Sequence, residues 1–270
     1  MLSVIIVTYN DPVRLRLCLH GLLRQTLRDF ELIVINDGGD REINRPVYEE
    51  MRRLGLAIDE IWHGPETTDF RLAAARNTGL RRAHCERTLF IDGDCILAPN
   101  VLAEHATYGS APQLVAGARK HLPAHCLQWL QPEQFDELDQ HVVANDERYR
   151  LFGPKYVGLR NLLRKGERVI PLTSYVLVWG FQVSVPTSWA RQIGGFNEEF
   201  VGYGGEDEEF AARMSQVGTS LLGRFDLISY HLDHPPRHVG KRTWLDRVKS
   251  SVARPDPVRN GGPLPGPDGF

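Results

Sequence analysis

The sequence predicts an α/β domain in which a mostly parallel central sheet has helices on both faces. Continuous apolar, β-branched runs at 2–8, 30–35 and 88–91 are typical of strands that are covered on both sides. The segments between these runs have helical patterns, so strands and helices alternate along the first half of the chain. Such βαβ units pair their strands in parallel, and ligands then bind beyond the carboxyl ends of the strands.

The first helix follows the first strand directly. Asp11 can cap this helix and Pro12 fits its first turn, while Leu15, Leu19 and Leu22 form an apolar stripe at helical spacing. Further along this half we expect helices at 46–54 and 70–83, a helix that opens at Pro99, and strands at 57–62 and 114–118.

Residues 119–172 interrupt the alternation. This segment is rich in Gln, Asp, Glu and Arg, and it predicts a helical insertion or a lid. The alternation then returns, with strands expected at 176–185 and 220–232 and helices at 187–193, 206–217 and 241–252. From 254 to 270, five prolines and four glycines in 17 residues predict a disordered tail, which leaves one folded domain over 1–253.

Composition narrows the class of protein. The 270 residues carry 32 basic and 34 acidic side chains, so the basic excess of a nucleic-acid-binding protein is absent. Four cysteines (Cys18, Cys85, Cys95 and Cys126) are scattered without a close pair, which favours reduced thiols. The apolar run at 2–8 is too short for a signal peptide or a transmembrane segment. We therefore expect a cytoplasmic protein whose membrane contact, if any, is peripheral.

A pair of carboxylates, Asp92-Gly93-Asp94, directly follows the strand at 88–91. Residues two apart in an extended chain point to the same side, and the glycine between them allows close backbone approach. Carboxylate oxygens are the ligands that hard divalent cations prefer, and such a cation can bridge to a diphosphate. A turn with two solvated aspartates is the alternative, because turns also favour Asp and Gly.

A second candidate for metal binding lies late in the chain, where His231 and His234 flank Asp233 at the end of an extended run. Imidazole nitrogens join carboxylates as ligands of divalent metals. Either histidine could instead be an ordinary polar residue with satisfied hydrogen bonds. The sequence leaves open which of the two binds a metal.

The densest acidic segment is GYGGEDEE at 202–209, where three glycines precede a predicted helix. The helix dipole favours acidic residues in the first turn, which accounts for one or two of them. Four consecutive acids behind three glycines, which cost backbone entropy, favour a functional role. We interpret one carboxylate of this segment as a general base.

Taken in order, these motifs resemble glycosyltransferase family 2. The segments that match its nucleotide-sugar half are VIIVTYN at 4–10, ELIVIND at 31–37, ARN at 75–77 with Gly79, and FIDGD at 90–94. GGFNE at 194–198 and GYGGED at 202–207 resemble the galactosyltransferase-type segment shared by β-1,4-galactosyltransferases, chondroitin polymerases and polypeptide N-acetylgalactosaminyltransferases. The resemblance implies the Rossmann-like GT-A fold, with a nucleotide-binding half (1–118), an insertion or acceptor lid (119–172) and a catalytic and acceptor half (173–240).

The resemblance also implies a role for each matched position. It assigns donor binding to Thr8, Tyr9, Asn10, Asp37, Arg76, Asn77, Asp92, Gly93 and Asp94. It assigns acceptor binding to Trp179, Gly180, Tyr203, Gly204 and Gly205. Asp94 with His234 or His231 would hold Mn²⁺ or Mg²⁺. Asp207 would deprotonate the acceptor, and Glu206 would bind sugar or acceptor hydroxyls.

The activity expected on this basis is transfer of one sugar from a nucleotide-diphosphate donor, with UDP as the expected nucleotide. The acceptor would be a glycan, a lipid, a peptide or a small molecule, and the anomeric centre would be inverted. Two rival functions remain. One is a sugar nucleotidyltransferase, although the first strand leads into Thr8-Tyr9-Asn10 rather than a glycine-rich triphosphate loop. The other is a catalytically inactive protein that binds a nucleotide-sugar.

Overall fold

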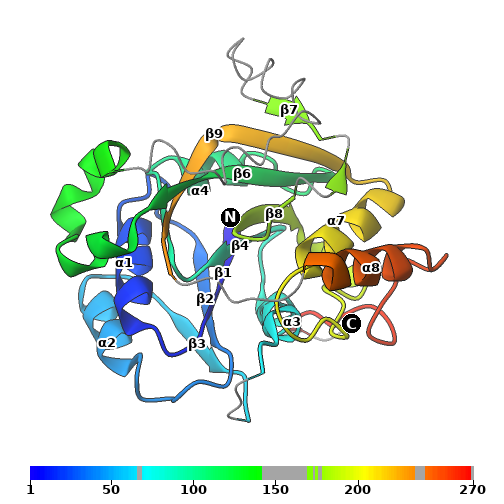
Figure 1. Cartoon of the computed structure of the whole chain (residues 1–270), viewed down its shortest axis with the longest axis horizontal. Coiled ribbons are helices and arrows are strands. Elements are labelled where there is room, and N and C mark those ends of the chain that lie inside the picture. The colour runs from blue at the N-terminus through cyan, green and yellow to red at the C-terminus, as the bar shows by residue number, and fades with distance from the viewer. Residues whose placement is uncertain (66–68, 142–168, 173, 176–177, 235–240, 269–270) are drawn as a thin grey trace.

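The computed structural model describes residues 1–65, 69–141, 169–172, 174–175, 178–234 and 241–268. Its described strands form one nine-stranded sheet in the order β3-β2-β1-β4-β8-β6-β9-β5, with β7 paired to β9 (Figure 1). The parallel part comprises β1 (Leu2–Thr8), β2 (Glu31–Asn36), β3 (Asp59–Trp62) and β4 (Arg87–Asp92). In this part the carboxyl ends of the strands meet at one edge.

The rest of the sheet is mixed. The strand β8 (Gln182–Pro186) is antiparallel to both β4 and β6 (Gln113–Leu122), and β6 is parallel to β9 (Ser220–Leu232). The short strands β5 (Cys95–Leu97) and β7 (Val169–Pro171) are antiparallel to β9. The predicted α/β sheet is confirmed, and the antiparallel strands form the part contributed mostly by the second half of the chain.

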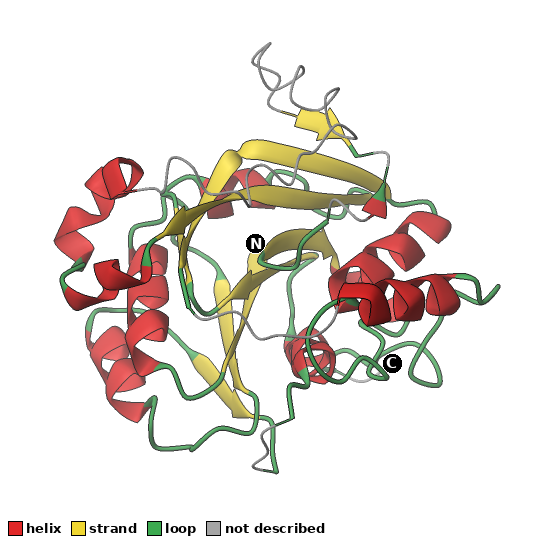
Figure 2. Ribbon diagram, viewed as in Figure 1, coloured by secondary structure: helices red, strands yellow, loops and turns green. Residues whose placement is uncertain are grey.

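Helices cover both faces of the sheet, as Figure 2 shows. One face carries α1 (Pro12–Leu23), α2 (Arg45–Arg53) and α4 (Val101–Ala106), and the other carries α3 (Leu72–Arg82), α6 (Thr187–Gln192) and α7 (Glu206–Gln216). The helix α8 (Lys241–Val252) packs on α7. Alternation along β1 explains the two layers, because Val4 packs toward Leu15 while Ile5 packs toward Ala75. None of the helices described is long and apolar enough to cross a membrane.

Residues 123–141 of the predicted insertion pack beside α1. The strand β6 continues to Leu122, and two 3₁₀ helices follow, η1 (Ala124–Gln128) and η2 (Pro132–His141). Phe135 and Leu138 of η2 share an apolar cluster with Leu17 of α1 and Ile96 of β5. This part therefore adds to the core on one flank of the sheet, and residues 142–168 of the predicted lid lie outside the described residues.

The C-terminal segment departs from the predicted disordered tail, because residues 254–268 pack against the domain. Leu264 is 5% exposed and joins the core, and its backbone N–H donates to the carbonyl of Arg191. The backbone N–H of Arg259 donates to the carbonyl of Ile193, and the Asn260 side chain donates to the carbonyl of Gly194. Prolines and glycines dominate the composition of this segment, so its sequence predicts disorder even though a few side chains anchor it to the domain.

A buried histidine makes stability depend on pH. His105 of α4 is 0% exposed, its Nε2 accepts from the Gln182 amide at 3.0 Å, and its Nδ1 lies 2.8 Å from Ser184 Oγ. This arrangement fits the neutral ring, and burial with the nearby charge of Arg87 lowers the pKa of His105 to about 3. The unfolded chain protonates this side chain near pH 6.5, so the folded state is stabilised above that pH and loses this advantage as pH falls toward the folded pKa.

Below pH 6.5 we expect His105 to lower the free energy of unfolding by up to about 1.4 kcal/mol per pH unit. Urea denaturation between about pH 7 and pH 5 measures this slope. His105→Gln keeps a polar side chain without titrating, so its slope should be shallower by that amount. Identical slopes for the two proteins would contradict the assignment.

Candidate active site

The loops after β1 and β2 are tied together at the carboxyl edge of the sheet. The backbone N–H of Asp37 donates to the carbonyl of Thr8 at 3.0 Å, and Asn10 Oδ1 accepts from the backbone N–H of Asp40 at 2.8 Å. Asn10 has a φ of 47°, a conformation that Asn tolerates better than most residues. Tyr9, which lies between Thr8 and Asn10 in the sequence, is half-buried. The first predicted donor-binding segment thus forms one surface with Asp37.

Asp37 is buried beside an arginine that the sequence pattern does not single out. It is 3% exposed, and its Oδ2 accepts from the backbone N–H of Arg71 at 3.0 Å, while Arg71 Nη2 lies 3.1 Å from Oδ1. Arg71 lies one residue before α3, where its local pattern resembles any helix start. A nucleobase that reaches Asp37 would therefore meet a carboxylate already paired with a guanidinium.

Asp92-Gly93-Asp94 forms the turn between β4 and β5. A Cβ on Gly93 would lie 2.9 Å from the carbonyl oxygen of Val7, so only glycine lets this turn lie so close to β1. Burial raises the pKa of Asp92, and the charge of Arg76 opposes this rise, while 32% of the Asp92 side chain remains exposed. The turn thus presents one carboxylate held by a cation and a second, Asp94, directed toward β9.

Strand pairing brings the late histidines to this turn. Cys95 of β5 pairs with His231 of β9, and the backbone N–H of Leu232 donates to the carbonyl of Asp94 at 2.9 Å. Asp94 Oδ2 consequently lies 3.4 Å from His231 Nε2 and 3.3 Å from His234 Nε2. Burial disfavours a charged Asp94, but hydrogen bonds from both histidines outweigh it and hold the pKa of the carboxyl below its usual range.

The ligand atoms of Asp94, His231 and His234 all lie within 4.8 Å of one another. An octahedral cation with ligands at about 2.1 Å places adjacent ligand atoms about 3 Å apart, so this spacing suits one divalent ion with little rearrangement. The set of one carboxylate and two imidazoles is a common one for transition metals. The structure thus brings both candidate histidines to Asp94.

Arg76 joins the two halves of the site. It is 2% exposed, and its guanidinium donates to Asp92 Oδ1 at 3.1 Å, to Glu206 Oε1 at 3.2 Å and to the carbonyl of Gly180 at 3.1 Å. A Cβ on Gly180 would lie 2.6 Å from Arg76 Nη2, so the glycine makes room for this contact. Arg76 therefore positions carboxylates from β4 and α7 relative to each other.

We expect Arg76→Met to lower the free energy of unfolding by about 3–5 kcal/mol, because it leaves buried Glu206 without its cation. Urea denaturation gives the value. Adding Glu206→Gln to Arg76→Met removes the unpaired charge and should restore part of the loss. A loss below about 1 kcal/mol for Arg76→Met would show that the pair does not hold the site together.

The glycines before α7 aim its first turn into the site. Gly205 caps the helix with a φ of 94°, a conformation that L side chains rarely adopt. Glu206 is 6% exposed, and burial with the adjacent charge of Asp207 raises its pKa to about 7 against the opposing charge of Arg76. Among the described residues, Glu206 Oε2 has no hydrogen-bond partner. It can therefore accept a hydrogen bond from a ligand.

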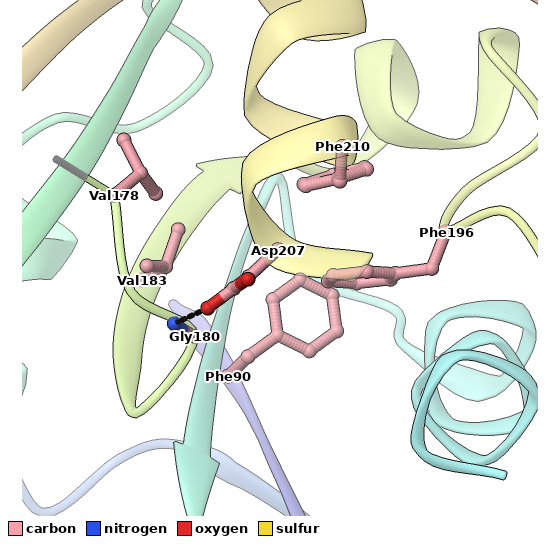
Figure 3. A pocket seen from close by; sticks show the side chains of 7 residues that line it. All are labelled: Phe90, Val178, Gly180, Val183, Phe196, Asp207 and Phe210. Atoms are coloured by element: carbon pink, nitrogen blue, oxygen red, sulfur yellow. Dashed lines mark hydrogen bonds between the residues drawn. The ribbon is translucent and has the colours of Figure 1, made fainter. Parts of the chain in front are cut away.

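Asp207 points toward the backbone of the loop before β8. Its Oδ2 accepts from the Gly180 N–H at 2.6 Å (Figure 3). Its Oδ1 accepts from the Glu208 N–H at 2.9 Å. Phe90, Phe196 and Phe210 lie behind it, with the last two rings stacked 4.1 Å apart, and the gap they leave does not admit water. Asp207 is thus a half-buried carboxylate beside an apolar wall.

The other two acids of the segment have different surroundings. Glu209 lies inside the protein, 2.8 Å from Arg213, and both side chains are 0% exposed. Burial and the charge of Asp207 raise the pKa of Glu208 to about 11, so its carboxyl is neutral at ordinary pH. Only Glu206 and Asp207 of the four acids have the surroundings expected for substrate chemistry.

The structure gives Asn77 a role other than the predicted donor contact. It is 0% exposed, and its side-chain amide donates to the carbonyl of Phe196 and accepts from the Phe196 N–H, both at 2.8 Å. Both polar atoms of the side chain are used inside the protein. Asn77 therefore supports the loop before α7, while its neighbour Arg76 faces the site.

The predicted acceptor residues lie in two segments, the loop before β8 and the loop before α7, which meet where Gly180 contacts Asp207. Trp179 is half-buried with its ring 6.4 Å from that of Phe181. Tyr203 is 51% exposed and its ring lies 6.3 Å from the ring of Phe70. Gly204 and Gly205 connect Tyr203 to α7 with φ angles of 90° and 94°. The exposed aromatic ring and the carboxylate thus lie in the same short segment.

Arg119 is a second cation that the sequence pattern does not single out. It lies on β6 with its guanidinium 4.8 Å from the centre of the Phe181 ring, and its charge opposes the rise in the pKa of Asp92. The sequence places Arg119 at the start of the predicted insertion, whereas β6 continues through it. The sequence signal that could have identified Arg119 is its spacing of two residues from His121, because residues two apart on a strand share a face.

The fold and this edge of the sheet define a glycosyltransferase with the GT-A fold. The chain belongs to glycosyltransferase family 2, whose sequence model, described as glycosyl transferase family 2, matches residues 3–165. A second model, described as the N-terminal domain of galactosyltransferase, matches residues 171–235. The expected family and enzyme class are confirmed.

Named relatives have the same class of activity. The chain is 31% identical over 242 residues to the validoxylamine A glucosyltransferase of Streptomyces hygroscopicus subsp. jinggangensis, covering 82% of this chain and 53% of that protein. It is 28% identical over 273 residues to the hyaluronan synthase of Pasteurella multocida, covering 93% and 27%. A solved structure of GalNAc-T7 with UDP, GalNAc and Mn²⁺ has a TM-score of 0.62 at 16% identity, covering 93% of this chain and 48% of that one, and supports the fold. The chain thus spans about a quarter to a half of these relatives' lengths.

Proposed function

We propose that this protein transfers one sugar from a nucleotide-diphosphate donor to an acceptor hydroxyl with the help of a divalent cation. The observation that carries the proposal is the convergence of Asp94, His231 and His234 within 4.8 Å beside the carboxyl ends of β1 and β4. Glu206 is joined to the same turn through Arg76, and the candidate base Asp207 accepts from the N–H of Gly180, whose carbonyl also accepts from Arg76.

The donor is expected to lie along the edge formed by the loops after β1, β2 and β4. Thr8, Tyr9 and Asn10 would contact the nucleoside, with the paired Asp37 and Arg71 beneath the base. UDP is our proposed nucleotide, which is supported by the UDP bound to the GalNAc-T7 neighbour. The diphosphate would then lie over the turn at Asp92-Gly93-Asp94.

Asp94, His231 and His234 would hold Mn²⁺ or Mg²⁺. A cation at this place supplies positive charge that neutralises the departing nucleotide diphosphate. Arg76 keeps Asp92 oriented, so that the carboxylate can accept hydrogen bonds from hydroxyls of the donor sugar. The unpaired Oε2 of Glu206 provides a further acceptor for a sugar or acceptor hydroxyl.

Asp207 acts as the general base in this proposal. Its carboxylate takes the proton from the acceptor hydroxyl while that oxygen forms a bond to the anomeric carbon of the donor sugar. The bond between this carbon and the diphosphate oxygen breaks in the same step, and the nucleotide diphosphate leaves. Attack from the face opposite the leaving group inverts the anomeric centre. The Gly180 N–H, 2.6 Å from Oδ2, holds the base in place.

The test is release of nucleoside diphosphate from a panel of nucleotide-sugars in the presence of Mn²⁺ and mixtures of glycan, lipid, peptide and small-molecule acceptors. The proposal predicts release that depends on one donor, one acceptor class and the cation. Release of pyrophosphate from a nucleoside triphosphate and a sugar phosphate would instead establish the rival nucleotidyltransferase. Tight donor binding with neither transfer nor hydrolysis would establish an inactive binding protein.

A further inference from the structure

A carboxylate lies behind one of the two candidate metal-binding histidines. Asp233 Oδ1 lies 3.2 Å from His231 Nδ1, whereas His231 Nε2 faces Asp94 Oδ2 at 3.4 Å. The two ring nitrogens thus face two different carboxylates. Asp233 is adjacent to His234 in the sequence, but its carboxylate contacts Nδ1 of His231, the ring nitrogen that does not face Asp94.

The contact to Asp233 fixes the orientation of the His231 ring. An ionised carboxylate only accepts hydrogen bonds, so Nδ1 must be the N–H donor. The other ring nitrogen, Nε2, is the one directed toward Asp94, so Nε2 would be the nitrogen that binds an ion at this site. Carboxylates that hold a metal-binding histidine in this way fix its tautomer and its orientation.

Asp233 is itself held from three sides. Its backbone N–H donates to the carbonyl of Leu122 at 3.1 Å, and its carbonyl accepts from Arg14 Nη2 of α1 at 2.8 Å. His121 Nδ1 of β6 lies 2.9 Å from the same Oδ1 that meets His231, and the two histidine rings pack edge to face 5.0 Å apart. The carboxylate therefore has a fixed position relative to β6 and α1.

The two candidate ligands differ in how firmly they are held. The His231 side chain is 8% exposed and lies between Asp94 and Asp233, whereas the His234 side chain is 35% exposed. His231 therefore needs less ordering when an ion binds, because its ring is already oriented before the ion arrives.

We propose that Asp233, supported by His121, is a positioning residue that holds His231 as the preorganised metal ligand of this site. This inference rests on the proposed metal-dependent function and adds the residues that orient the ligand. Asp233 contacts neither the metal nor the substrate in this account. It acts through the Nδ1–H of His231, and His121 keeps its carboxylate aimed.

Calorimetric titration of the purified protein with Mn²⁺, in the presence of UDP, tests the proposal without measuring activity. Asp233→Ala is expected to weaken Mn²⁺ binding by about 10- to 100-fold. Asp233→Asn keeps an acceptor without the charge, so it should give an intermediate loss. The matched control is Asp226→Asn, which removes a carboxylate of the same strand that pairs with Arg224. It should bind Mn²⁺ like the wild type.

NMR of ¹⁵N-labelled histidine separates positioning from folding. With a diamagnetic divalent ion such as Zn²⁺ bound, His231 should carry its proton on Nδ1 in the wild type, and a mixture of tautomers should appear in Asp233→Ala at unchanged melting temperature. The His231 signal is assigned by its loss in His231→Gln. Equal Mn²⁺ affinity in wild type and Asp233→Ala, or an ion-loaded wild type in which His231 carries its proton on Nε2, would overturn the inference.

The same titration separates this inference from the proposed function. Two Mn²⁺ ions per chain would overturn the inference alone, because Asp233 would then be a ligand in the second cluster formed with His121 and His231. Absence of Mn²⁺ binding to the wild type, with and without UDP, would overturn the proposed metal dependence as well.

Discussion

Replacing Asp207 by Asn is expected to slow sugar transfer by about 10²- to 10⁴-fold with little change in donor affinity. The amide keeps the size of the carboxyl group and can still accept from the Gly180 N–H, so the loop before β8 stays in place. It cannot take the acceptor proton, and the acceptor oxygen is then a poor nucleophile. Initial rates at saturating donor, together with a donor titration, measure the two quantities.

Glu208→Gln is the matched control for this variant. Glu208 is the next residue of the same helix, and because its pKa is raised to about 11 its carboxyl is already neutral at the assay pH. An amide there mimics the native state, so transfer should continue near the wild-type rate. If Asp207→Asn kept full activity, or lost donor binding in parallel, Asp207 would not be the base.

Replacing Asp94 by Asn is expected to remove metal-dependent donor binding. The carboxylate is the only anionic member of the cluster with His231 and His234, and a neutral amide is a much weaker ligand for a divalent cation. Donor affinity in Mn²⁺ should fall to that of the wild-type protein in EDTA, and transfer should be lost. Calorimetry with and without chelator gives the comparison.

The wild-type protein in EDTA serves as the control for Asp94→Asn, because both lack the bound ion by different routes. The two should agree, and adding Mn²⁺ should restore only the wild type. Donor affinity in the variant that still responds to Mn²⁺ would show that the ion binds elsewhere.

The sequence predicts the local elements well because their signals are local. The apolar runs that become β1, β2 and β4 need only the residues within each strand. The candidate metal site is harder to predict from the sequence. Asp94 meets His231 and His234 only because β5 pairs with β9, and these strands are more than a hundred residues apart. No local sequence pattern predicts that His231 will face Asp94.

The acidic segment at the start of α7 shows a second limit of prediction from sequence. Its four acids form one cluster in the sequence. Consecutive side chains on a helix point about 100° apart, so each acid meets a different environment. Glu206 meets Arg76, Asp207 meets Gly180, and Glu209 meets Arg213. Their separate surroundings follow from what packs against the helix, which the sequence of the segment does not contain.

The most direct test of the central claim is a calorimetric titration of the protein with a panel of nucleotide diphosphates and nucleotide-sugars, first with Mn²⁺ and then with EDTA. We predict that one nucleotide-sugar binds in Mn²⁺ and that this binding is lost in EDTA, because the ion held by Asp94, His231 and His234 bridges protein and diphosphate. Binding that is unaffected by EDTA, or no binding across the panel, would contradict a metal-dependent donor site.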